Sequence, residues 1–157
     1  MSYSFGIQNT VDFYRALERH VDDYLKSPLS SEKAVVSAMF SWHLTDWIYN
    51  EYPSIASSFN KLGDYVRDLK SQCPSLAFMQ DISNGTKHHS ITKYVPSVRK
   101  TEEHHGAFSD AFQKTAFDVS CLKLTLADGS VVYFDEVITK VRDFWRNYFK
   151  NTLGASV

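Results

Sequence analysis

One short stretch, DISNGTKHHS from Asp81 onward, holds a carboxylate, a carboxamide, a lysine and two histidines in close succession. If this stretch is helical, Asp81, Asn84 and His88 fall within roughly 60° of one another, because their spacing is i, i+3 and i+7. His88 could then act as a general acid or base, since imidazole titrates near neutral pH. Asn84 and Lys87 could hold an oxyanion or a phosphate, and Asp81 could orient the imidazole. These four residues form the candidate catalytic set.

A second polar stripe with the same spacing lies in the predicted helix over residues 31–52. His43, Asp46 and Asn50 share one face of that helix, flanked by tryptophans. Buried polar groups need hydrogen-bond partners, so if the two helices are neighbours, each stripe is the natural partner of the other. Two interpretations stay open: a functional site, or an internal hydrogen-bond network that only fixes the helix register.

The elements that must position these residues follow from the spacing of apolar side chains. Most of the chain repeats them with the period of a helix, and Pro53 and Pro74 interrupt the pattern. We therefore predict a mainly α fold, an up-and-down bundle of about five helices in one domain over residues 1–157. The predicted elements are helices at about 10–27, 31–52, 54–72 and 75–89, a β insertion at about 90–134, and a helix at about 135–151.

The insertion is predicted to form a small antiparallel hairpin or sheet. SITKYVPSV alternates with a period of two, and its proline favours an edge strand or the end of one. KTEEHHGAFSDAFQKTA is predicted to be a polar connection. Asp128-Gly129 separates two alternating apolar runs, which indicates a hairpin whose two turn residues both adopt positive φ.

Composition limits the classes of function. The chain has 157 residues, 43% of them hydrophobic, and a formal net charge of −1, so nucleic-acid binding would need a local basic patch. Cys73 and Cys121 lie far apart, which is typical of a reduced cytosolic protein. No apolar run is long enough to span a membrane. We therefore expect a soluble, cytoplasmic protein without membrane contact.

Neither a cofactor nor a metal is expected. His88-His89 and the run Glu102–His105 could supply several metal ligands, but they lack the i, i+3 or i+4 spacing of a preformed site. The sequence also has no glycine-rich phosphate loop.

The last predicted helix carries more aromatic surface than a bundle of this size requires, in Phe144, Trp145, Tyr148 and Phe149. These side chains are expected to lie in the core, with a homodimer interface as the alternative.

The DISNGTKH segment, together with HLTDW of the second predicted helix, resembles the HEPN superfamily. More narrowly, it resembles small uncharacterised bacterial proteins with an HLxDW … DixNxxKH pattern. The resemblance covers residues 10–90 and the last helix, with the β segment as an insertion. It implies a helical bundle that dimerises so that two motifs face each other, and RNA cleavage without metal through attack by the 2′-hydroxyl.

HEPN ribonucleases place an arginine before the histidine, and the corresponding positions here are Asp81, Ile82 and Ser83, none of which is basic. Lys87 is only a partial substitute, because lysine lacks the bidentate phosphate contact of arginine. We therefore expect a non-catalytic or weakly catalytic HEPN-like module that binds RNA, a nucleotide or a protein and could form a homodimer. The alternative is a metal-independent endoribonuclease of toxin or defence type that uses His88.

Overall fold

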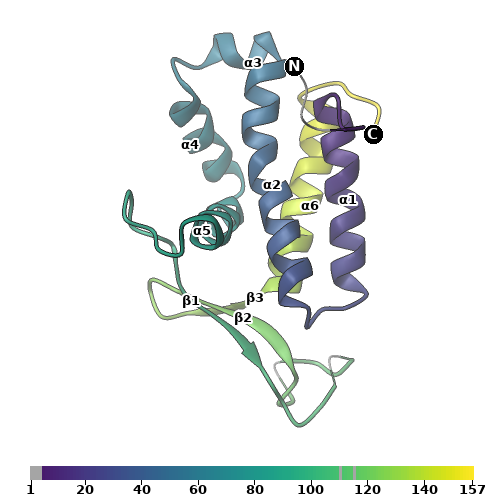
Figure 1. The fold of residues 1–157 in the computed structure, drawn as a ribbon, viewed down its shortest axis with the longest axis vertical. Coiled ribbons are helices and arrows are strands. Elements are labelled where there is room, and N and C mark those ends of the chain that lie inside the picture. Colours follow the sequence, from purple (N-terminus) through teal and green to yellow (C-terminus); the bar gives the residue numbers. More distant parts are fainter. Residues whose placement is uncertain (1–4, 110, 115) are drawn as a thin grey trace.

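The computed structural model describes residues 5–109, 111–114 and 116–157. Within these ranges the chain forms six helices, and a three-stranded antiparallel sheet precedes the last of them, which confirms the predicted fold class (Figure 1). The sheet has the order β1-β2-β3. The elements are α1 (Thr10–Leu25), α2 (Ser31–Glu51), α3 (Pro53–Ser58), α4 (Leu62–Gln72), α5 (Ser75–His88), β1 (Val98–His104), β2 (Cys121–Leu126), β3 (Val131–Tyr133) and α6 (Phe134–Asn151).

The core is one apolar cluster to which α1, α2, α4, α5, α6 and β2 contribute. Helices α1, α2 and α6 run side by side (Figure 1). The prediction that the aromatic side chains of the last helix lie in the core is confirmed for Trp145, Tyr148 and Phe149, which are buried, whereas Phe144 is partly buried against them. Trp145 donates its indole N–H to the carbonyl of Ser41 on α2 at 3.1 Å, so its one polar atom is satisfied. The large aromatic side chains of α6 therefore belong mainly to the core. None of the helices in the described part of the chain is long and apolar enough to span a membrane.

The helix predicted over residues 54–72 is wrong in one respect, because two helices, α3 and α4, share this stretch. The chain leaves α3 at Phe59, whose backbone is extended, and Lys61 is extended as well. Ser57 and Ser58 both donate their hydroxyls to the carbonyl of Ser54. Serine side chains that bond the preceding turn compete with helix propagation, which the apolar spacing alone does not reveal.

The first strand also differs from the prediction. Residues 90–97 are irregular. β1 begins only at Val98, the last residue of SITKYVPSV, and most of it, from Lys100 to His104, lies in the segment predicted to be a polar connection. β1 pairs with β2 along its length, with one irregularity in register between Val98 and Lys100. Its residues are mostly charged and exposed, so the strand has no apolar alternation to detect. Pairing with the apolar β2 determines its conformation.

The hairpin between β2 and β3 is confirmed, but its turn differs from the predicted one. Gly129 has φ of +86°, whereas Asp128 is not among the residues with positive φ. The Leu126 N–H donates to the carbonyl of Ser130, and the Gly129 N–H donates to the carbonyl of Leu126. The loop therefore has three residues, and Gly129 is the last of them. A loop of this kind needs a positive φ at only one residue.

The segment after β1 packs against residues 118–120, which lead into β2, with a close backbone contact at Gly106. The Phe108 N–H donates to the carbonyl of Asp118 at 2.9 Å, and the Gly106 N–H donates to the Ser120 hydroxyl at 3.0 Å. A Cβ atom placed on Gly106 would lie 2.2 Å from the Asp118 carbonyl oxygen. Glycine is therefore required here by contact with backbone, which cannot move aside as a side chain can.

We predict that Gly106→Ala destabilises the protein by about 1–3 kcal/mol, because the loop must shift to relieve the overlap. Gly63→Ala is the matched control, since a Cβ there meets nothing within 4 Å in the first turn of α4. That control should leave stability unchanged or raise it by up to about 1 kcal/mol. Urea unfolding of both variants measures the difference, and equal effects of the two substitutions would contradict the assignment.

Candidate functional site

Asp81 is buried, with 5% of its surface exposed, and its carboxylate holds the start of the sheet. One oxygen, Oδ2, accepts the backbone N–H groups of Ser97 and Val98 at 2.7 and 2.8 Å. Hydrogen bonds to a charged acceptor contribute roughly 1.5–3 kcal/mol each. Lys70 on α4 interacts electrostatically with this carboxylate: burial lowers the pKa of Lys70, and Asp81 opposes that shift. Asp81 thus ties α5 to β1 and does not face His88.

Asn84 also binds the segment that leads into the sheet. Its side-chain amide donates to the hydroxyl of Tyr94 at 3.2 Å. Burial raises the pKa of Tyr94 to about 12, and the nearby Asp81 carboxylate adds to the shift. The phenol therefore stays neutral at physiological pH and serves as a fixed hydrogen-bond partner.

Lys87 and His88 lie at the exposed end of α5. Among the described residues, His88 has no hydrogen-bond or ion-pair partner, so no carboxylate orients its imidazole. His89 follows with φ of +61° and ψ of −33°, a conformation that cannot continue the helix, and so α5 ends at His88. The predicted stripe is therefore divided: two members hold the chain together, and the other two face solvent.

The polar stripe of α2 is less buried than the sequence predicted. Helices α2 and α5 pack against each other, as expected, but Asp46 and Asn50 are exposed. The Asn50 amide donates to the backbone carbonyl of Asp46 at 2.7 Å, one turn earlier in its own helix. Burial lowers the pKa of His43, Asp46 opposes this shift, and Lys87 of α5 adds to it. The charge of Lys87 therefore reaches His43, but no hydrogen bond joins the two stripes in the described part of the chain.

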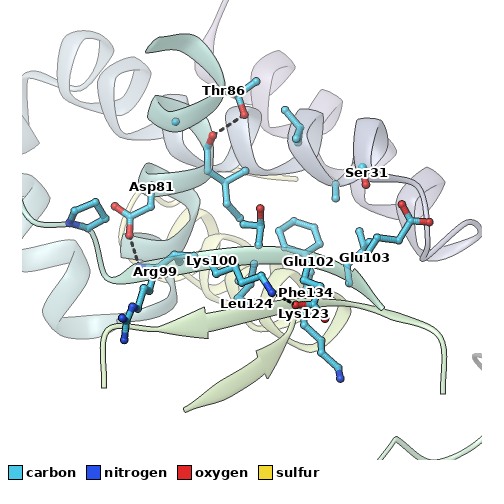
Figure 2. A pocket seen from close by; sticks show the side chains of 18 of the residues that line it. Ser31, Asp81, Thr86, Arg99, Lys100, Glu102, Glu103, Lys123, Leu124 and Phe134 are labelled. Carbon is cyan, nitrogen blue, oxygen red and sulfur yellow. Dashed lines mark hydrogen bonds and ion pairs between the residues drawn. The ribbon is translucent and has the colours of Figure 1, made fainter. Parts of the chain in front are cut away.

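A cleft of about 640 Å³ lies between α5, the first turn of α2 and the sheet (Figure 2). Its apolar lining includes Val35, Ile82, Val98, Leu122, Leu124 and Phe134. Polar residues at its borders include Ser31, Thr86, His89, Glu102 and Glu103. In Figure 2, Asp81 lies at one end of the cleft with its bond to β1, and Glu103 extends from β1 toward Ser31. Acidic and basic groups both line the cleft, so its charge favours neither anions nor cations.

The histidines after β1 do not converge with those of α5. His104 Nε2 lies 2.6 Å from Asp118 Oδ1, and His105 Nε2 lies 3.6 Å from Glu103 Oε1. Within the described ranges, no three His, Cys, Asp or Glu side chains gather closely enough to hold a metal ion. The His104–Asp118 pair instead fastens the loop that follows β1.

Sequence reasoning missed β1 as part of a candidate site, although six successive residues of this strand, Val98–Glu103, line the cleft. The signal that could have found it is the order of charge in Arg99-Lys100-Thr101-Glu102-Glu103, two bases followed by two acids. When such a strand pairs with an antiparallel strand that has the same order of charges, the bases of each lie opposite the acids of the other, which favours pairing.

We predict that Asp81→Ala lowers the free energy of unfolding by roughly 2–4 kcal/mol, because two part-buried N–H groups lose their charged acceptor. Asp81→Asn should cost less, since the amide oxygen can still accept. Asp46→Ala, the removal of an exposed carboxylate, should change stability by no more than about 0.5 kcal/mol. Chemical unfolding of the three variants tests this, and an Asp81→Ala protein as stable as Asp46→Ala would refute the anchoring role.

We also predict an acid-sensitive contribution from His43. Its pKa is lowered in the folded protein, so the unfolded chain binds the proton more readily. This contribution to stability is complete above the unfolded pKa of about 6.5 and is lost as the pH falls below it. Urea unfolding at about pH 7.5 and 5.5 should show a smaller loss for His43→Gln than for the parent. Some loss should remain, because burial lowers the pKa of His20 too; an unchanged loss would exclude His43 as a contributor.

Comparisons with protein-family models, with curated proteins and with solved structures give no match to this chain. The similarity to HEPN proteins therefore remains a prediction from its sequence motif, and the functional argument depends on the geometry of the chain itself.

Proposed function

We propose that this chain is a HEPN-like binding module for RNA or a nucleotide, non-catalytic or weakly catalytic, and that it contacts phosphate through the exposed end of α5. The observation that carries the proposal is the division of the candidate catalytic set. Asp81 binds the backbone at Ser97 and Val98, and Asn84 binds Tyr94, so neither is free to assist His88.

General acid–base catalysis by histidine usually needs a third group that holds the ring in place. His88 has no such group among the described residues, and the arginine of HEPN ribonucleases has no counterpart at Asp81, Ile82 or Ser83. Rapid RNA cleavage would require both functions. Binding requires neither, because a phosphate can be held by mobile surface cations.

Lys87, His88, His89 and Lys93 lie at or just beyond the C-terminal end of α5, and all four are exposed. The two lysines give this segment positive charge on a protein whose net charge is −1. The negative end of the α5 dipole offsets part of this charge. The resulting contact should be weak and dependent on salt, as expected for a few phosphate contacts.

We predict that the parent protein binds single-stranded RNA in EDTA with an affinity that falls as salt rises, and cleaves it slowly or not at all. Lys87→Glu should weaken binding several-fold and lower the slope of log K against log salt by about one for each lost phosphate contact. Lys150→Glu, a reversal of an exposed lysine at the end of α6, is the matched control and should leave binding unchanged. Binding is measured by fluorescence anisotropy, and cleavage on gels.

Two results would decide against the proposal. If the parent cleaves RNA rapidly in EDTA and folded His88→Ala does not, the chain is a metal-independent endoribonuclease. If the parent binds no RNA or nucleotide at low salt, the exposed end of α5 is not a phosphate-binding surface.

A further inference from the structure

β1 is an edge strand whose outer side faces the cleft. It pairs only with β2 in the described part of the chain, and the sheet order leaves its other side without a strand. Beyond Val98, whose N–H is bound by Asp81, no described segment hydrogen-bonds the backbone of this open edge. Such an edge can accept a further strand, and proteins usually cover or disrupt it.

The cleft leaves space along this edge. Residues Val98–Glu103 line it without interruption, although successive side chains of a strand point to opposite faces. A cleft that meets all of them follows the edge of the strand. Lys100 and Glu102, which form an ion pair within β1, have side chains that are 63% and 37% exposed, so a neighbouring strand could reach both.

The charges of β1 are complementary to themselves when the strand is reversed. If two copies of β1 run antiparallel about Thr101, Lys100 of each lies opposite Glu102 of the other, and Arg99 lies toward Glu103. Opposite charges across strands stabilise pairing, and like charges in that position oppose it. Parallel, in-register pairing would place Lys100 beside Lys100 and Glu102 beside Glu102. The charge order therefore selects one direction and one register.

We propose that two copies of this chain associate through their β1 edges, antiparallel about Thr101, to form one continuous six-stranded sheet. This inference goes beyond the proposed function and does not depend on it. The twofold arrangement uses each β1 edge once and is therefore closed. The opposite edge of the sheet, β3, has three residues and continues directly into α6, so it offers little for further growth.

The register irregularity next to Arg99 makes Lys100 and Glu102 the better residues to test. A bulged residue departs from the regular alternation of the strand, and in Figure 2 the Arg99 side chain extends away from the helices. Lys100 and Glu102 lie in the regular part of the pairing with β2.

The experiment measures mass in solution by sedimentation and light scattering at about 100 µM protein, a concentration at which micromolar dimers are populated. The parent should be a dimer. Lys100→Glu should raise the dimer Kd at least about tenfold, since it replaces two attractive pairs by repulsive ones. The double variant Lys100→Glu/Glu102→Lys restores complementarity and should dimerise like the parent. Circular dichroism confirms that each protein is folded, which is expected because both side chains are exposed.

A mixing experiment separates this edge from any other surface. The variant Arg99→Glu/Lys100→Glu and the variant Glu102→Lys/Glu103→Lys should each be monomeric alone and should form a heterodimer when mixed. A monomeric parent would overturn the proposal. So would single charge reversals that leave the dimer intact, or mixed variants that are folded and stay monomeric.

Discussion

The arrangement of the whole molecule depends on one buried carboxylate. The helices and the apolar side of β2 share one core, and Asp81 adds a polar link to the sheet, because it accepts two backbone N–H groups at the start of β1. A charge removed from water is tolerated only when it is well bonded, so this carboxylate can occupy few positions. Its two bonds set where the chain leaves the irregular segment after α5 and where the first strand begins.

The same constraint changes the meaning of the polar residues on α5. Asp81 and Asn84 have the types and spacing of a catalytic set, but both bind the segment that connects α5 to the sheet. Lys87 and His88 lie one to two turns further along, past the last point where the chain packs over the helix, and so they remain in solvent. Residues with regular helical spacing can therefore lie in two different environments, here the contact with the connecting segment and the solvent. Chemistry at His88 would therefore need a group that the substrate or a partner supplies.

The interactions that stabilise the helical bundle differ from those that β1 can make. The helical bundle is held by apolar burial, which is not directional, and Trp145 and Phe149 fill its centre. β1 has little apolar surface, and its residues are arranged by the sign of their charge. Such a strand contributes little to the core, yet it can distinguish one neighbour from another. Because β1 lies beside the cleft, its charged side chains are accessible to a neighbouring strand.

The sequence alone determined the features that depend on local periodicity. The helix class, the aromatic stripe of α6 and the Asp128-Gly129 hairpin all follow from spacing that a single element contains. The break between α3 and α4, the strand at Val98–His104 and the roles of Asp81 and Asn84 were decided only by tertiary structure. The strand and the role of Asp81 depend on partners distant in sequence: β1 is extended because it pairs with β2, and the N–H groups of Ser97 and Val98 donate to the Asp81 carboxylate. A spacing pattern records which residues share a face, but it does not record what that face meets.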